Sequence, residues 1–314
     1  MRSIEICAGA GGQALGLEQA GFEHTVLVEI DADACATLKN NRPYWNVIKG
    51  DIKDFSAKNY QNIDLLAGGV PCPPFSIAGK QLGNEDERDL FPEALRIARE
   101  CKPKAIMLEN VRGIFNKKFN YYRSEIEFIL KKMGYECTWE IIQAHDYGVS
   151  QMRSRSLLVA MQKKYFPYFS MPPNTISQIP TVGQLLYDEM ACGGWENARI
   201  WAEQAAGIAP TLVGGSKKHG GADLGPTRAK SVWKKLGVDG NGIADAPPAK
   251  GFTGTPRLTV KMAALVQGFP PEWRFAGKKT SAYRQVGNAF PPPAAKAVSG
   301  SILKALSDGE IKEK

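Results

Sequence analysis

The stretch Gly68-Gly69-Val70-Pro71-Cys72-Pro73-Pro74-Phe75-Ser76 places a cysteine just after residues 63–67, an apolar run that predicts a buried strand. Glycine and proline end that strand abruptly, so we expect Cys72 on a stiff turn at its carboxyl end. Ligands of open α/β sheets bind at this edge. Cys72 is therefore a candidate nucleophile, and the alternative is a small buried hydrophobe, the common state of a free cysteine.

Three strand-like runs near the start of the chain end in residues typical of a nucleotide pocket: 3–7 in Ala8-Gly9-Ala10-Gly11-Gly12, 25–28 in Glu29, and 46–49 in Gly50-Asp51-Ile52. The glycines let a ligand approach the backbone at a helix N-terminus. An acidic residue after the second strand holds ribose hydroxyls in such sheets. The pattern predicts an α/β fold with a doubly wound, mostly parallel, Rossmann-like sheet and an adenosyl or nucleotide pocket.

The glycine spacing separates two classes of ligand. Dinucleotide folds use Gly-x-Gly-x-x-Gly to receive a pyrophosphate, whereas here Gly9-x-Gly11-Gly12 is followed by Gln13-Ala14-Leu15. S-adenosylmethionine has an adenosine but no phosphate, so it fits this spacing better. A nicotinamide dehydrogenase is correspondingly disfavoured.

Further polar groups are expected at the same edge of the sheet. The apolar run 105–108 ends in Glu109, for which the alternative is a capping or salt-bridged carboxylate. Between two closing strands, Gln151, Arg153 and Arg155 would share one strand face by two-residue alternation. Two adjacent arginines there need an anion or a carbonyl partner.

The positive charge is concentrated in one segment of the 314 residues. Of 40 Lys and Arg and 32 Asp and Glu, residues 210–280 hold 12 and 4, so this segment carries the whole net charge of +8. A localised basic excess indicates a polyanion partner such as nucleic acid, and the alternative is a solvated Lys-rich loop. From about residue 166 the chain becomes rich in Gly, Pro and Lys, which predicts loops and short strands.

Other features narrow the class of protein. The polar run 77–89 predicts a mobile loop that closes over a substrate. The six cysteines form no Cys-x-x-Cys pair and there are three histidines, so neither a metal site nor a disulfide framework is expected. No apolar run approaches a membrane span and no signal peptide is recognisable. We expect a cytoplasmic protein.

Taken in order, these motifs resemble the C5-cytosine-specific DNA methyltransferase family, in particular its bacterial restriction–modification type. The resemblance covers almost the whole chain and rests on these pieces: Ala8-Gly9-Ala10-Gly11-Gly12, Glu29, Asp51-Ile52, Pro71-Cys72 with Phe75-Ser76, Glu109-Asn110-Val111, Gln151-x-Arg153-x-Arg155, Thr259 through Pro270, and Gln285-Val286-Gly287-Asn288. The chain departs from the family at Cys7, where a phenylalanine is common, and at Pro73, where a glutamine often follows the nucleophile.

The resemblance implies a catalytic S-adenosylmethionine-binding domain over 1–169 and 278–314, and a smaller irregular target-recognition domain over 170–277. It implies methyl transfer to C5 of a flipped-out cytosine in duplex DNA, through a covalent Cys–C6 intermediate, with S-adenosylhomocysteine as product. The catalytic residues would be Cys72, Glu109, Arg153, Arg155 and Asn110. The cofactor-binding residues would be Cys7, Ala8, Gly9, Ala10, Gly11, Gly12, Glu29, Ile30, Asp51, Ile52, Pro71, Leu90, Asn288 and Ala289. The DNA-binding residues would be Ser76, Lys80, Gln81, Arg88, Thr211, Leu212, Lys217, Lys218, Arg228 and Lys230.

Two other functions remain open at this point. An RNA cytosine methyltransferase would use the same chemistry, but the recognition segment of about 100 residues, with its basic excess, argues against it. A DNA-binding regulator without activity is disfavoured because Cys72, Glu109 and both arginines are present. We expect a monomer in the bacterial cytoplasm, associated with the nucleoid when on DNA. A cognate restriction endonuclease would act on the same site without direct contact.

Overall fold

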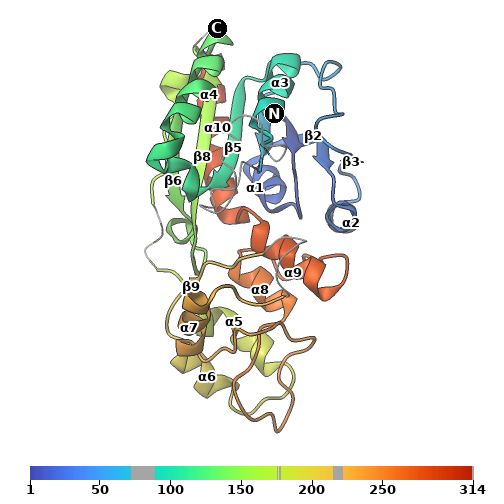
Figure 1. Cartoon of the computed structure of the whole chain (residues 1–314), viewed down its shortest axis with the longest axis vertical. Helices are drawn as coiled ribbons and strands as arrows, with labels where there is room; N and C mark the ends of the chain where they lie inside the picture. The colour runs from blue at the N-terminus through green and yellow to red at the C-terminus, as the bar shows by residue number, and fades with distance from the viewer. Residues whose placement is uncertain (72–88, 175, 177, 215–221, 313–314) are drawn as a thin grey trace.

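A computed structural model describes residues 1–71, 89–174, 176, 178–214 and 222–312. Figure 1 shows an upper lobe built on one sheet and a lower lobe of short helices and loops. Cys72, Ser76, Lys80, Gln81, Arg88 and most of the loop expected over 77–89 lie outside the described residues, as do Lys217 and Lys218.

The upper lobe confirms the predicted doubly wound sheet. Its seven strands have the order β3-β2-β1-β4-β5-β8-β6, and the pairs are parallel except where β8 runs antiparallel to β5 and β6. The strands are β1 (Arg2–Ile6), β2 (Glu23–Glu29), β3 (Val47–Lys49), β4 (Leu65–Gly68), β5 (Ala105–Val111), β6 (Tyr135–Gln143) and β8 (Ser154–Gln162).

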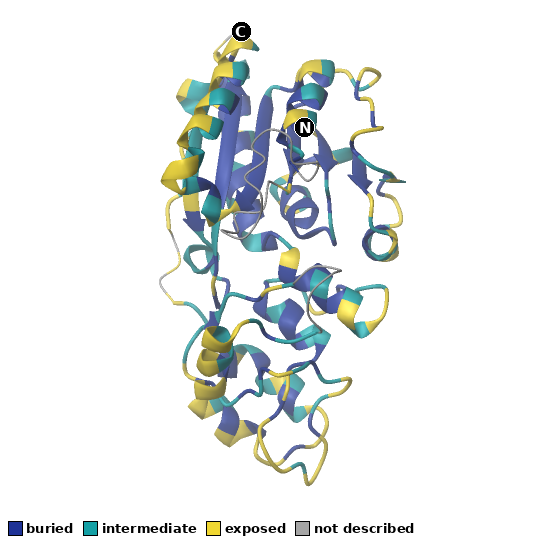
Figure 2. Cartoon of the chain, viewed as in Figure 1, coloured by how far each residue is buried: buried dark blue, intermediate teal, exposed yellow. Residues whose placement is uncertain are grey.

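Alternating strand residues bury both faces of this sheet, as Figure 2 shows. Leu66 faces the helices α3 and α4, whereas its neighbours Leu65 and Ala67 face α10. The helices of this lobe are α1 (Gly12–Ala20), α2 (Ala32–Asn41), α3 (Phe91–Cys101), α4 (Asn120–Lys132) and α10 (Pro292–Ile311). The last helix packs against α1, so the end of the chain returns to the upper lobe.

The lower lobe corrects the expectation of loops and short strands. Its described part contains three helices that we did not expect, α5 (Val182–Ala191), α6 (Ala198–Gln204) and α7 (Thr227–Lys235), whereas β9 (Ala209–Pro210) has two residues and pairs with β7 (Gln151–Met152). The helix α8 (Val260–Val266) agrees with the pattern of residues 258–270, which predicts a capped helix that ends at Gly and Pro. A capping box between Thr181 and Gln184 begins α5. The many Gly and Pro residues obscured this start.

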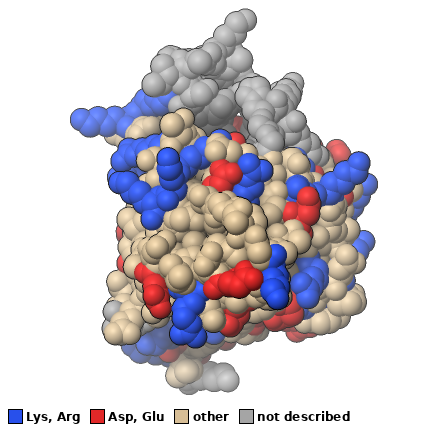
Figure 3. All heavy atoms as spheres, turned by 90° about the horizontal axis from the view of Figure 1, so that it is seen from below, with Lys and Arg blue, Asp and Glu red and all other residues tan. Residues whose placement is uncertain are grey.

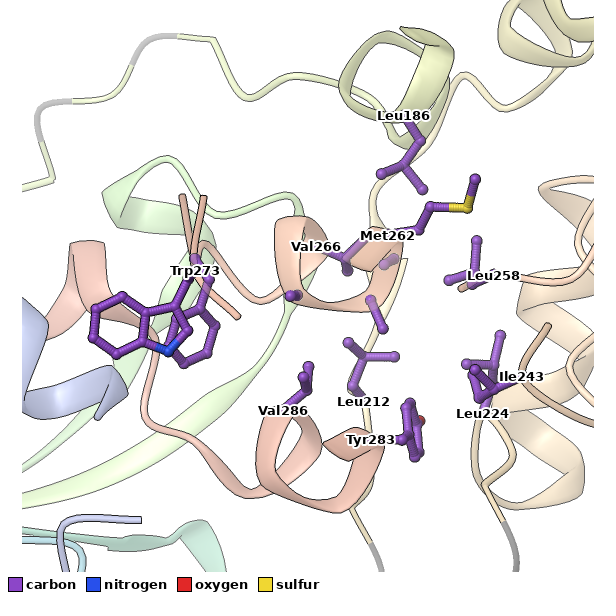
Figure 4. Close-up of a cluster of buried hydrophobic side chains, with 14 of the residues drawn as sticks. Leu186, Leu212, Leu224, Ile243, Leu258, Met262, Val266, Trp273, Tyr283 and Val286 are labelled. Atoms are coloured by element: carbon purple, nitrogen blue, oxygen red, sulfur yellow. The ribbon is translucent and has the colours of Figure 1, made fainter. Parts of the chain in front are cut away.

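A shared hydrophobic cluster joins the two lobes (Figure 4). It runs from Leu186 and Leu224 through α8 and α9 (Lys279–Asn288) to Trp273. The Trp273 indole N–H donates to the carbonyl of Ala10 in the glycine-rich turn, at 3.2 Å. Residues around Trp273 thus contact the upper lobe although the sequence assigned them to the recognition domain. The domain boundaries stay a prediction.

Candidate active site

A cavity of about 760 Å³ opens at the carboxyl ends of the strands, where the sequence predicted a ligand site. It has two walls. The strand-end wall consists of residues that follow β1 to β5, and the helix wall consists of α9 with the turn after it. The strand-end wall includes Cys7, Ala8, Gly9, Ala10, Gly12, Glu29, Ile30, Asp51, Ile52, Pro71, Glu109 and Asn110. The helix wall includes Arg284, Gln285, Asn288, Ala289 and Phe290.

The glycine-rich turn and Glu29 form one end of the strand-end wall. Gly9 has φ +54° and a Cβ there would meet nothing within 4 Å, so the backbone borders open space. The N–H groups of Gly9 and Asp31 donate to the two Glu29 carboxylate oxygens, each at 2.7 Å. Burial raises the pKa of Glu29, while these two donors lower it. Asp31 also caps α2, by accepting from the N–H groups of Asp33 and Ala34.

Cys7 and Gly11 differ from the other residues of this turn. Cys7 is a non-glycine residue at φ +51°, and burial raises its thiol pKa, so the thiol stays protonated. Gly11, which we expected to bind the cofactor, is not in the cavity wall. It caps α1 at φ +84°, and a Cβ would lie 2.7 Å from Leu38 and 3.0 Å from Trp273. Its place is therefore fixed by packing.

Glu109 and Arg155 form an ion pair in the same cavity. The Arg155 Nε donates to Glu109 Oε1 at 2.7 Å. A Cβ added to Gly69 would lie 3.3 Å from Glu109 Oε2, so the second carboxylate oxygen lies against the turn that leads to Cys72. Burial raises the Glu109 pKa, and the positive charges of Arg155 and Arg153 oppose that rise.

Asn110 binds the same turn through hydrogen bonds. Its side-chain amide donates to the carbonyl of Val70 at 2.9 Å and its oxygen accepts from the N–H of Val111 at 2.7 Å. Pro71, the residue after Val70, lines the cavity. The residue before Cys72 is therefore part of the cavity wall, although Cys72 itself lies outside the described residues.

Arg153 is not a member of the cavity wall, which corrects the expectation that it shares the exposed face of Arg155. Its side chain is fully buried and donates to the carbonyls of Leu212, Gly287 and Ala289 at 2.8, 2.9 and 2.9 Å. Burial lowers its pKa strongly, with Arg155 adding to the effect. Strand pairing is interrupted at Arg153, between β7 and β8, so the two-residue alternation does not hold there.

Arg153 therefore ties the strand-end wall to the helix wall and to the segment around Leu212. Gln285 reinforces the attachment of α9, because its Oε1 accepts from the Thr37 hydroxyl of α2 at 2.6 Å. Thr37 and Gln285 are both buried. These contacts join parts of the chain that are far apart in the sequence, so no local pattern could indicate them.

Glu5 and Gln13 are polar residues of the cavity that the sequence analysis missed. Both are buried and line the cavity, and their side-chain oxygens and the Gln13 nitrogen have no hydrogen-bond partner. Burial raises the pKa of Glu5 well above its usual range, with the nearby Glu29 as a smaller contribution. The only feature of the sequence that could have indicated Glu5 is that it is an acidic residue inside the mostly apolar strand β1. These orphaned polar atoms are what a cavity for a polar ligand would contain.

The residues that we expected to contact DNA differ in their exposure and in their bonding partners. Arg228 is exposed on α7, whereas Lys230 pairs with Asp223 at 2.8 Å. Leu212 is buried, and its N–H and carbonyl bind Gln151 and Arg153, so it anchors the segment and is not exposed to DNA. The Thr211 hydroxyl donates to the carbonyl of Met152. Seen from below, Lys and Arg gather most densely at the upper left of the surface (Figure 3).

The part of the chain that the structure describes contains neither a candidate metal centre nor a candidate membrane span. No group of three or more His, Cys, Asp or Glu could hold a metal ion there. No helix there is both long and apolar enough to cross a bilayer.

Comparison with known proteins gives a consistent result. The family profile described as C-5 cytosine-specific DNA methylase matches residues 1–304. The type II methyltransferase M.NgoMIV of Neisseria gonorrhoeae is 55% identical over 309 residues, covering 97% of either chain. The type II methyltransferase M.NaeI of Lentzea aerocolonigenes is 55% identical over 318 residues, covering 99% of this chain and 77% of that protein.

Solved structures show the same fold at lower sequence identity. A DNA modification methyltransferase encoded within an Escherichia coli prophage superposes with a TM-score of 0.70 at 22% identity, covering 98% of this chain and 99% of that one. The Dnmt2 methyltransferase of S. pombe superposes with a TM-score of 0.65 at 17% identity, covering 98% and 99%.

Proposed function

Because the chain belongs to the C-5 cytosine-specific DNA methylase family, we propose that it transfers a methyl group from S-adenosylmethionine to C5 of a flipped-out cytosine at a specific site in duplex DNA. The observation that carries this proposal is the arrangement of one cavity. Glu109 and Arg155 lie beside the turn that enters Cys72, and the same cavity reaches Glu29 and Asp51.

The cavity fits S-adenosylmethionine in size and in polarity. Gly9 leaves room for a ligand against the backbone, and Glu29 and Asp51 offer carboxylates for ribose hydroxyls and an adenine amine. Glu5 and Gln13 add orphaned polar atoms. Asn288, Ala289 and Leu90 would complete the binding site. When bound, S-adenosylmethionine supplies the electrophilic methyl group.

Cys72 would act as the nucleophile. Its thiolate adds to C6 of cytosine, which breaks the aromaticity of the ring and makes C5 an enamine carbon able to attack the methyl group. Negative charge then builds toward N3 and O2. After methyl transfer, loss of the C5 proton and elimination of the thiolate restore the ring and release 5-methylcytosine.

Glu109 and Arg155 would stabilise that charge. A protonated Glu109 donates to N3, and its raised pKa favours the protonated form. Arg155 is held beside Glu109 and can bind O2. Asn110 fixes the turn under Cys72 through Val70. Arg153 is a positioning residue, because its guanidinium is occupied by three backbone carbonyls.

The target carbon is stacked inside the duplex, so the base must be flipped out at a cost of a few kcal/mol. Phosphate contacts from the basic segment 210–280 and from the loop 77–89 would offset that cost. Residues 170–277 would form the target-recognition domain. Since two relatives are named type II methyltransferases, we infer a role in restriction–modification in the bacterial cytoplasm, beside an endonuclease that acts on the same site.

Methyl transfer from tritiated S-adenosylmethionine tests this proposal. We expect incorporation into duplex DNA and none into transfer RNA, and bisulfite sequencing would then locate the methylated cytosine. Cys72→Ser should abolish transfer, whereas Cys192→Ser, at an exposed cysteine of the lower lobe, should not. Methylation of RNA alone would reverse the substrate assignment, and an active Cys72→Ser enzyme would remove the mechanism.

A further inference from the structure

Three cations project from the chain just past the carboxyl end of β5. Arg112, Lys117 and Lys118 are exposed, and none of them has a carboxylate partner in the part of the chain that the structure describes. Between residues 111 and 123 the sequence has four basic residues and no acidic one. Tyr121 lies among them with 81% of its surface exposed. We call Arg112, Lys117, Lys118 and Tyr121 the β5–α4 patch.

The backbone under this patch is held by its own contacts. The Arg123 guanidinium donates to the carbonyl of Ile114 and to Asn120 Oδ1 at 2.8 Å, and it lies 4.9 Å from the centre of the Phe115 ring. Ile114 is fully buried. The fourth cation of the segment therefore serves the fold, and the other three are presented outward from an ordered support.

The position of the patch connects it to the cavity. Asn110 and Val111 line the cavity wall, and Arg112 is the next residue. Figure 1 shows β5 ending at the side of the sheet that faces the lower lobe. A duplex that delivers a base into this cavity must pass its rim, where cations without carboxylate partners would meet phosphates.

The patch lies in the part of the chain that carries no net charge. Outside residues 210–280 the chain has equal numbers of basic and acidic residues, 28 of each. An acid-free run of four cations within that neutral part is therefore not explained by an overall basic surface. The observation that points to a function is that Arg112 directly follows Val111 of the cavity wall.

We propose that the β5–α4 patch is a second DNA-binding surface, on the catalytic lobe, that holds the phosphate backbone beside the cavity independently of residues 210–280. This inference rests on the proposed function, because it takes duplex DNA as the substrate. Each phosphate contact releases counterions, so the logarithm of the affinity falls with the logarithm of salt with a slope of about −0.9 per contact.

Fluorescence anisotropy of a labelled duplex over a salt series tests the proposal. In the Arg112→Ala, Lys117→Ala, Lys118→Ala variant, losing three contacts should flatten the slope by up to about 2.7 units. The control Lys131→Ala, Lys132→Ala, Lys163→Ala removes the same charge from exposed residues at the opposite end of the sheet, and it should keep nearly the wild-type slope. Arg112→Lys, Lys117→Arg, Lys118→Arg should restore it.

A patch variant with the wild-type slope would overturn the inference, and so would equal flattening in the control. Loss of binding to an RNA hairpin with DNA binding intact would also overturn it. Methyl transfer by the wild-type enzyme, measured in the same preparation, separates this inference from the proposed function. If the wild type methylates duplex DNA and the patch variant keeps its slope, the inference alone fails.

Discussion

The two walls of the cavity are built by different means. In the strand-end wall, residues such as Gly9, Glu29 and Glu109 lie at or near the carboxyl ends of neighbouring strands, so the sheet register brings them together. The helix wall belongs to a helix near the end of the chain, and Arg153 holds it in place through the carbonyls of Gly287 and Ala289. Local sequence therefore determines the first wall, whereas long-range packing determines the second.

Arg153 and Arg155 show the same difference two residues apart. Arg155 reaches the cavity and pairs with Glu109. Arg153 lies behind it, fully buried, and joins Leu212 of the lower lobe to the helix wall. Substitutions in the strand-end wall should therefore change chemistry or ligand affinity, whereas substitutions behind the helix wall should change stability and affinity together.

The largest effect is expected from Glu109→Gln. Loss of the proposed proton donor should lower kcat by about 10²- to 10⁴-fold, with affinity for S-adenosylhomocysteine retained.

Because burial raises the Glu109 pKa and the protonated form is the donor, wild-type kcat should fall as pH rises through that pKa. The variant should lack this fall. Single-turnover rates over pH would measure both effects, with the exposed Glu136→Gln as control. A near-normal kcat would exclude Glu109 as the donor.

Arg153→Leu tests the helix wall. It removes the three hydrogen bonds that the guanidinium donates to the carbonyls of Leu212, Gly287 and Ala289, although the Ala289 carbonyl keeps Gln267 Nε2 as a donor. The free energy of unfolding should therefore fall by about 3 kcal/mol. Affinity for S-adenosylhomocysteine should fall as well, because Asn288 and Ala289 lose their support. Urea unfolding and calorimetry give the two quantities, and Arg153→Lys should recover part of each. Normal stability would mean that this arginine does not hold the two walls together.

Glu29→Ala should weaken S-adenosylhomocysteine binding by about 10- to 150-fold, which corresponds to losing a hydrogen-bonding charge worth about 1.5–3 kcal/mol. The same change releases the N–H groups of Gly9 and Asp31. Glu29→Gln can still accept one of these bonds and should lose less. If calorimetry gave wild-type affinity for both variants, the ligand would not be bound at this end of the strand-end wall.

The smallest effect concerns Glu5, which the strand-end wall buries without a partner. Its folded-state pKa is raised above the unfolded value. At pH values between the unfolded-state and the folded-state pKa, the folded protein therefore binds more protons than the unfolded chain. The free energy of unfolding should fall as the pH rises through this range. Glu5→Gln should flatten this decline and be more stable than the wild type by about 1 kcal/mol near pH 8. Urea unfolding at pH 5 and pH 8 measures the difference, and parallel declines would show that Glu5 ionises without cost.

The sequence indicated the strand-end wall almost completely, for a physical reason. Apolar runs that end in Gly9, Glu29, Asp51 and Glu109 belong to parallel strands, whose carboxyl ends meet at one edge. Gly11 does not line the cavity. We expected it there because a glycine required for packing and a glycine required for a ligand look alike in a sequence. Glu5 was missed because a single acid in an apolar strand gives no periodic pattern.

The helix wall and the lower lobe were harder to predict. The contact of Arg153 with Ala289 spans 136 residues, and that of Thr37 with Gln285 spans 248. No local pattern encodes such contacts. Alternation predicted Arg153 on the face of Arg155, but the break in strand pairing between β7 and β8 changed its direction. The helices α5, α6 and α7 were missed because Gly and Pro residues in the connecting loops obscured their pattern.

Covalent trapping tests the central claim most directly. A duplex with 5-fluorocytosine at the methylated position has no C5 proton to lose, so the bond between Cys72 and C6 should persist after methyl transfer. We predict that the wild-type enzyme with S-adenosylmethionine gives a stable DNA adduct, that mass spectrometry assigns it to Cys72 with one added methyl group, and that Cys72→Ser gives none. An enzyme that methylates ordinary cytosine but forms no adduct, or forms it on another residue, would contradict the account.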